Sequence, residues 1–453
     1  MGLAQGKQAM TESGSVREEG LLRQLSVVGL WLLIVNGMIG AGIFGLPGEL
    51  AKLAGEGSVW VFILCALMIA PIMLCFAQMS SYFRGTGGPI VYASRAFGPM
   101  AGFQVGWLYY ISRVLSFAAN LNLLIVSLGY LWPQAMDGSI RVTLAFVACA
   151  LMTVINVVGA RGAVRTLGML TIAKILPLIA LAAIGIVSLD AGQLVPQVHH
   201  AVGIEDLGAA VFLVIYAYVG FEGGLVPAGE AHHPQRDIPR ALVAALVLCA
   251  LLYTLIQAVS LATLPGLADS PRPLVDVARA QLGETGALLM LLAIIASVGG
   301  NLLGAMFSTP RITYRMALDE HLPSALGRVH PRFHTPAVSI LLYGSASFAF
   351  AVTGGFVWLA GLSVLARLIL YVVCTCALPR LRREYASQPG ALLLPGSQLW
   401  MILSLLVCAA LLYQVKLDAA MVTIGCMVAG LLLYYYARVV QRRGTAPAIP
   451  AND

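Results

Sequence analysis

Two glycine-rich stretches interrupt apolar runs of the sequence, and their composition points to a binding function. The first reads Asn36-Gly-Met-Ile-Gly-Ala-Gly-Ile-Phe-Gly-Leu-Pro-Gly48. The second reads Tyr218-Val-Gly-Phe-Glu-Gly-Gly224 and is followed by Pro227 and Gly229. Each glycine costs about 1 kcal/mol relative to alanine in a helix interior, so neither stretch favours a continuous helix. Close packing of helices through small residues is the competing interpretation.

Unwound backbone of this kind can bind a molecule that carries both charges. The N–H groups at the start of a half-helix attract a carboxylate, and the carbonyl groups at the end of one attract an ammonium or another cation. An α-amino acid carries both groups, so it suits a site built from the two stretches.

Four ionisable residues lie inside apolar runs: Arg113, Lys174, Glu222 and Arg367. A charge at the centre of a membrane costs at least about 2.5–3.5 kcal/mol, so each is a functional candidate. We expect Lys174 either to exchange a proton or to remain charged and bind backbone carbonyls. For Glu222 we expect a response to protons or a contact to a cationic substrate, unless the N–H groups of its own turn satisfy it.

Structural pairing or snorkelling explains the two arginines better than a direct function does. Arg367 follows Lys174 by 193 residues (174 to 367), while the two glycine-rich stretches are 180 residues apart (Gly40 to Gly220). Lys174 and Arg367 are therefore expected to occupy roughly corresponding places in two halves of the chain.

The rest of the sequence predicts no metal, phosphate or hydrolytic site. The eight cysteines all fall in apolar stretches and are interpreted as small buried hydrophobes, and the seven histidines lie on predicted loops. A Walker-type phosphate loop and a Ser-His-Asp constellation are both missing from the sequence. We therefore expect no cofactor, no bound metal, no nucleic-acid partner and no enzymatic activity.

The composition requires a lipid environment around these residues. Of 453 residues, 27 are basic and 20 acidic, so 10% are charged, against roughly 25% in an average soluble domain. The hydrophobic share is 59% and the mean hydropathy is +0.88. These values exclude a soluble enzyme, a disordered chain and a secreted disulfide scaffold. The sequence predicts an all-α integral membrane protein.

Spans follow from length, because a helix needs about 20 apolar residues to cross the hydrocarbon. The sequence predicts twelve transmembrane helices, at 26–51, 58–82, 101–132, 140–160, 167–189, 206–230, 239–264, 286–310, 337–354, 356–378, 398–414 and 417–437. An interfacial or re-entrant element is predicted at 86–97, and an amphipathic helix on a loop at 270–283.

The distribution of lysine and arginine predicts the orientation. These residues favour one side of the predicted spans by about four to one, which places both termini in the cytoplasm. The predicted parts are an N-terminal tail (1–24), a transporter domain (25–438) and a C-terminal tail (439–453), in a plasma or bacterial inner membrane.

The two glycine-rich spans are the first and the sixth, and each begins a block of five spans. Disrupted helices in corresponding places of two halves are a pointer to a transporter binding site. The predicted repeats run over about 26–189 and 206–378, with the last two spans (about 398–437) at the periphery. Those two spans have apolar faces that suit lipid or a homodimer contact.

Gly40-Ala-Gly-Ile-Phe44 resembles a signature in the first span of the amino acid–polyamine–organocation (APC) superfamily. Val219-Gly-Phe-Glu222, with Pro-Ala-Gly-Glu230 and His233-Pro-Gln-Arg-Asp-Ile-Pro-Arg240, is similar to its sixth span and the following loop. The resemblance covers residues 20 to 440. It implies a leucine-transporter-type fold of two inverted repeats, alternating access, and an amino acid or amine as substrate.

The resemblance also implies roles for single residues. The substrate carboxylate would meet the N–H groups around Ala41, Gly42 and Ile43, next to Gly40. The ammonium would meet carbonyls near Met38, Ile39 and Val219. The Lys174 ammonium would replace the sodium ion of sodium-driven relatives and would tie the unwound part of the first span to the fifth or eighth.

Further side chains resemble the arginine–agmatine antiporter branch. Asn120 falls on a substrate-binding asparagine, Tyr216 on an aromatic lid residue, and Glu222 on a glutamate linked to proton sensing. Asn301 stands where that branch has a gating tryptophan, which removes a surface for stacking a guanidinium. Tyr216 and Phe221 are the candidate gates.

Together these features predict sodium-independent secondary transport of amino acids or related amines, coupled to protons. One alternative is strict exchange of two solutes without proton movement, and a second is a membrane sensor that binds an amino acid and signals. The expected partners are a small amino acid or amine, a proton and the lipid bilayer.

Overall fold

The computed structural model describes residues 25–83, 87–158, 163–188, 203–226 and 231–444. Within these ranges the chain is helical, with one isolated bridge between Leu25 and Ala231 and no strand. The predicted N-terminal tail and residues 227–230 of the second glycine-rich stretch lie outside the described residues.

Each predicted span overlaps a helix of the structure. The long helices are α4 (Ser58–Ser80), α6 (Pro99–Leu128), α7 (Gly138–Val158), α8 (Ala163–Ser188), α11 (Pro234–Thr263), α12 (Pro273–Ser308), α15 (Phe356–Tyr385) and α17 (Leu417–Gly444). The shorter ones are α2 (Val27–Met38), α3 (Ala41–Ala54), α5 (Pro89–Phe97), α10 (Ile204–Tyr218), α13 (Pro310–Leu318), α14 (Ala337–Thr353) and α16 (Ser397–Tyr413).

Among the described residues, eight helical segments are long and apolar enough to cross a membrane, and four shorter apolar helices accompany them. The shorter ones include α14 and α16, which have 17 residues each and are about 26 Å long at 1.5 Å per residue. Another is α2, which has 12 residues because the first glycine-rich stretch ends it. The molecule is thus an all-helical, multi-pass membrane protein.

Both glycine-rich stretches break their helices. In the first, α2 ends at Met38, Ile39 and Gly40 are non-helical, and α3 begins at Ala41. In the second, α10 ends at Tyr218, Val219 is extended, and Gly220 has a φ of 106°, a left-handed value that glycine adopts most readily. A short 3-10 turn, η4 (Phe221–Gly224), follows. We refer to residues 39–40 as the first break and to 219–220 as the second break.

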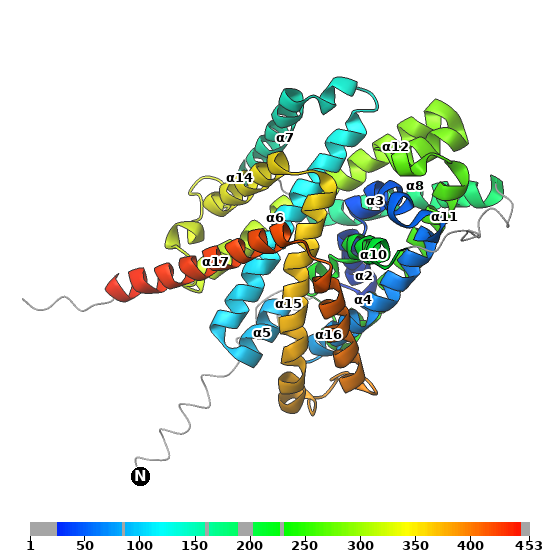
Figure 1. Cartoon of the computed structure of the whole chain (residues 1–453). Coiled ribbons are helices and arrows are strands. Elements are labelled where there is room, and N and C mark those ends of the chain that lie inside the picture. The colour runs from blue at the N-terminus through cyan, green and yellow to red at the C-terminus, as the bar shows by residue number, and fades with distance from the viewer. Residues whose placement is uncertain (1–24, 84–86, 159–162, 189–202, 227–230, 445–453) are drawn as a thin grey trace, which may run out of the picture.

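The contacts between helices define two groups. One contains α2, α3, α4, α10 and α11, and the other contains α6, α7, α12 and α14, of which α12 also packs against α3. Figure 1 shows α7 and α14 side by side, away from α2, α4 and α10. Helix α8 packs against α2, α11 and α12, while α15 packs against α6, α10 and α5. Both breaks therefore belong to the first group, and the two helices that carry Lys174 and Arg367 contact both groups.

The two short elements predicted outside the spans also contain helices. The element predicted at 86–97 contains α5, which follows Gly87 and Gly88, both with positive φ. The helix predicted at 270–283 is the first part of α12, which begins at Pro273 and bends at Gly283. Helix α17 continues past the predicted end of its span at residue 437, as far as Gly444.

Candidate functional site

The two breaks lie against each other, and glycine makes this approach feasible. A Cβ atom added to Gly37 would lie 2.5 Å from the carbonyl oxygen of Gly220, and a Cβ on Gly220 would collide with the Gly37 carbonyl. One turn further on, a Cβ on Gly42 would lie 2.8 Å from the Cα of Ala217. The start of α3 and the end of α10 are thus in direct backbone contact.

Helix α3 presents free backbone donors at the first break. The first N–H groups of a helix have no partner inside it, and here the residue before the helix is Gly40, which has no side chain to cap them. Ala41, Gly42 and Ile43 are buried. The partial positive charge of the helix start is therefore held away from water, where a carboxylate would bind it well.

Lys174 binds the carbonyl end of α2 at the same break. Its Nζ lies 3.2 Å from the Asn36 carbonyl oxygen, 2.9 Å from that of Ile39, and 3.1 Å from Oδ1 of Asn301. The Lys174 side chain is 1% exposed. A cation at the end of a helix complements its partial negative charge. Lys174 thus ties α8 to α2 and to α12.

The carbonyls at the first break already have protein donors. The Ile39 carbonyl accepts hydrogen bonds from Lys174 and, at 3.2 Å, from Nδ2 of Asn301. The Met38 carbonyl accepts from the Tyr253 hydroxyl at 3.2 Å and from the N–H of Gly40 at 2.9 Å. Asn301 therefore lies beside Lys174 and the first break, as a hydrogen-bonding partner of both.

Tyr216 and Asn120 meet next to the second break. The Tyr216 hydroxyl donates to Oδ1 of Asn120 at 3.0 Å, and the Tyr216 ring contacts that of Phe356 edge-on, with centroids 5.9 Å apart. Both polar residues are buried. This bond joins α10 to α6, so it links the two helix groups at the level of the break.

Phe221, the second candidate gate, lies on the other side of the break. Its ring stacks on Tyr371 with centroids 5.6 Å apart and meets Phe76 edge-on at 5.7 Å. Its side chain is fully buried. The two predicted gates therefore flank the second break and contact different aromatic neighbours.

Replacing Tyr216 with phenylalanine is expected to weaken substrate binding about 10-fold while leaving the protein folded. The change removes the hydroxyl and leaves Oδ1 of the buried Asn120 without this donor, which costs about 1–3 kcal/mol. The apparent KM for uptake measures the effect. Tyr110→Phe is the control, because in the described part of the chain the buried Tyr110 hydroxyl has no hydrogen-bond partner. An equal effect of both changes would contradict the prediction.

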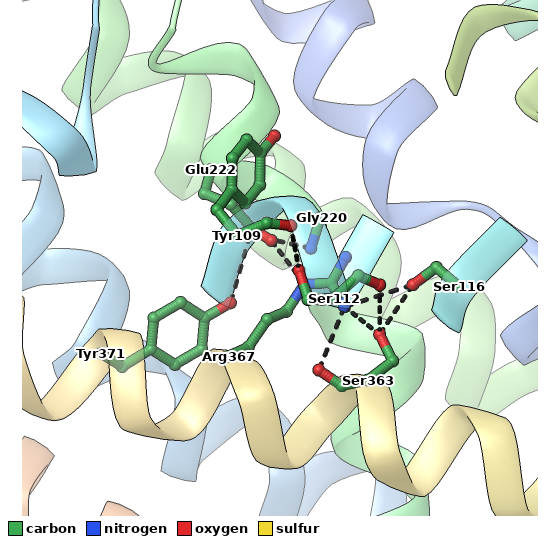
Figure 2. A network of polar contacts seen from close by, with 8 residues as sticks. All are labelled: Tyr109, Ser112, Ser116, Gly220, Glu222, Ser363, Arg367 and Tyr371. Carbon is green, nitrogen blue, oxygen red and sulfur yellow. Dashed lines mark hydrogen bonds and ion pairs between the residues drawn. The ribbon is translucent and has the colours of Figure 1, made fainter. Parts of the chain in front are cut away.

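Glu222, just after the second break, forms a buried ion pair with Arg367 of α15 (Figure 2). Oε1 of Glu222 lies 2.6 Å from Nε of Arg367, and both side chains are at most 1% exposed. The second oxygen, Oε2, accepts from the N–H of Gly220 at 3.0 Å and from the Tyr371 hydroxyl at 3.1 Å. The Gly220 N–H group and the Tyr371 hydroxyl therefore satisfy one carboxylate oxygen, and Arg367 satisfies the other.

Sequence reasoning favoured structural pairing for Arg367 but did not identify its partner. The available signal was the similar spacing of Lys174 to Arg367 and of the two breaks. This similar spacing places Lys174 and Arg367 on corresponding helices of the two predicted repeats. In the structure, Lys174 contacts the first break, and Arg367 contacts Glu222, two residues after the second break.

The sequence matches known proteins along most of its length. The model of a family described as amino acid permease matches residues 25–435. The branched-chain amino acid permease BcaP of Bacillus subtilis (strain 168) is 25% identical over 93% of this chain and 94% of its own. The serine/threonine exchanger SteT of the same organism is 26% identical over 83% and 87%. Its methylthioribose transporter is 25% identical over 94% and 96%.

These relatives are all named as carriers of small molecules, and the match includes both breaks and their surroundings. The family match extends over the helices that hold Lys174, Glu222 and Arg367 as well. The chain therefore belongs to the amino acid permease family of the APC superfamily, whose members are transmembrane transport proteins.

Proposed function

We propose that the protein transports amino acids by alternating access, independently of sodium and coupled to protons. One observation carries the proposal: the uncapped N-terminus of α3 and the end of α10 meet at two facing breaks, and Lys174 holds the adjoining carbonyls. A substrate carboxylate would bind the N–H groups of Ala41, Gly42 and Ile43. Its ammonium would lie at the carbonyl end of α10, near Val219, because Ile39 already accepts two hydrogen bonds.

Lys174 is the proposed replacement for a sodium ion. A lysine ammonium bound by two backbone carbonyls and an amide oxygen supplies the single positive charge that an alkali cation would supply to the same ligands. Sodium is then not needed to hold the end of α2. Tyr216 and Phe221 are the proposed gates, because they flank the second break, and Tyr216 also joins α10 to α6.

Proton coupling, in this proposal, runs through Lys174. Both oxygens of Glu222 are engaged, one by the guanidinium of Arg367 and the other by Gly220 and Tyr371. The negative charge of this carboxylate is therefore already compensated by donors of the protein. Lys174 binds two backbone carbonyls and one amide oxygen, which are all neutral, so it can lose its proton without leaving a buried anion unpaired.

The proposed topology has twelve spans, with inverted repeats over about 26–189 and 206–378 and both termini cytoplasmic. Support comes from the two breaks at the start of each half and from the basic end of α17, where Arg438, Arg442 and Arg443 follow the apolar part.

Strict exchange without proton movement is the second candidate, favoured by the relative named as a serine/threonine exchanger. Proteoliposomes separate the two. Labelled amino acids would be offered to empty vesicles with an inward proton gradient, and to vesicles preloaded with the same solute without a gradient, each with sodium or choline outside.

Accumulation driven by the gradient, equal in sodium and in choline, is the expected result. Uptake that needs preloading would instead establish exchange. Uptake that needs sodium, or no uptake of any amino acid by folded protein, would overturn the proposal.

A further inference from the structure

We propose that Arg367 is a specificity-determining residue: as a resident counter-ion of Glu222, it restricts the site to amino acids with uncharged side chains. The inference rests on the proposed function, because it concerns the substrate of that same site. It adds the class of side chain and names the residue that sets it.

Glu222 is the carboxylate that a cationic substrate would need. In the described part of the chain, three charged side chains are buried: Lys174, Glu222 and Arg367. Glu222 is therefore the one buried anion of these residues, and it lies two residues after the second break. A substrate with a lysine-like or guanidinium side chain would have to find its negative partner there.

Arg367 already occupies that place. Glu222 has about four acceptor positions on its two oxygens, and the Arg367, Gly220 and Tyr371 donors use three. The pair has no net charge, so a second cation would lose its hydration on entry without gaining an uncompensated anion. An amino acid with a neutral side chain has no such loss.

The guanidinium is fixed in position by serines of two helices (Figure 2). Nη1 of Arg367 donates to Oγ of Ser116 at 3.2 Å and to the Ser363 hydroxyl, and the two serine hydroxyls lie 2.7 Å apart. Ser363 also donates to the Ser112 carbonyl at 3.0 Å. The serines therefore hold the Arg367 guanidinium in place in addition to Glu222.

These serines also bring the pair to the candidate site. Ser116 precedes Asn120 by four residues on α6, so the two lie on one face of the helix, and Asn120 binds Tyr216. The guanidinium thus lies one helical turn from the hydrogen bond that links α6 to α10. In this proposal, the side chain of a bound amino acid points from the breaks along α6 toward the ion pair.

The test compares ligands that differ in charge but little in shape: lysine against norleucine, and glutamate against glutamine. Binding to purified protein is measured by ligand-induced thermal stabilisation, which needs no transport. Wild type is expected to bind norleucine about 10-fold or more tightly than lysine. Arg367→Gln is expected to reverse this preference, since the freed Glu222 can pair with the lysine side chain. Arg367→Lys, the matched control, keeps the wild-type preference.

A second variant tests the proposal in the opposite direction, should Arg367→Gln fail to fold. Glu222→Gln leaves the Arg367 guanidinium without its anion, so glutamate is expected to bind more tightly than glutamine. The double variant Glu222→Gln with Arg367→Gln should prefer neither charged ligand.

Wild type that binds lysine as tightly as norleucine, or a folded single variant with unchanged preference, would overturn the proposal. Uptake of norleucine by wild-type vesicles separately tests the proposed function, so that one idea can fail without the other.

Discussion

Replacing Lys174 with methionine is expected to reduce amino acid uptake about 100-fold or more. Methionine fills a similar volume but leaves three acceptors, the carbonyls of Asn36 and Ile39 and Oδ1 of Asn301, without this charged donor. Hydrogen bonds to charged groups contribute about 1.5–3 kcal/mol each, and about 1.4 kcal/mol is a factor of ten. The first break would lose the group that fixes its geometry. Initial rates of uptake into proteoliposomes, normalised to folded protein, measure the effect.

Two further variants make this result interpretable. Lys52→Met removes an exposed cation from α3 and is expected to leave uptake near the wild-type rate. Lys174→Arg keeps a positive charge but cannot release a proton. If Lys174 couples transport to protons, the arginine variant should exchange solute across preloaded vesicles and fail to accumulate it on a proton gradient. Uptake by Lys174→Met at more than half the wild-type rate would contradict the role of Lys174.

The helix breaks could be predicted from the sequence because their cause is local. Glycine is unfavourable in a helix wherever it lies, so clustered glycines at 37–48 and 220–224 indicate an interruption without knowledge of the fold. The structure interrupts the helices at residues 39–40 and 219–220, within Asn36–Gly48 and Tyr218–Gly224. The contact of Lys174 with the first span was implied by the resemblance instead, because no local feature of the sequence brings residue 174 to the carbonyls of residues 36 and 39.

The partners of Arg367 and Asn301 could not be predicted, because they depend on how helices are rotated against each other. Arg367 and Glu222 are 145 residues apart, and hydropathy does not show which face of α15 meets α10. The resemblance aligns Asn301 with a gating tryptophan and does not indicate its partners. In the structure its side chain binds Lys174 and the Ile39 carbonyl.

The helix ends show a similar limit. Helix α17 continues to Gly444 although its apolar run ends near residue 437, because backbone hydrogen bonds continue where hydropathy falls. Basic residues in the last turns suit the negative end of the helix, so the helix persists beyond the part that hydropathy assigns to the membrane.

Replacing Gly220 with alanine is expected to abolish uptake and to destabilise the protein. Gly220 has a φ of 106°, which costs an L-residue about 1–2 kcal/mol, and a Cβ there would collide with the carbonyl of Gly37. Forcing an extra carbon into a packed site costs about 1–3 kcal/mol more, so the sum is about 2–5 kcal/mol. The apparent unfolding temperature in detergent, together with uptake, measures the effect.

Gly223→Ala is the matched control, because Gly223 lies in the same turn and an added Cβ would meet the Tyr109 hydroxyl at an ordinary 3.5 Å. Gly37→Ala introduces the same collision from the opposite side without requiring a left-handed backbone. If packing between the breaks dominates, Gly37→Ala should be nearly as harmful as Gly220→Ala. If backbone strain dominates, it should be much milder. A Gly220→Ala protein as stable and active as Gly223→Ala would show that the two breaks need not touch for transport.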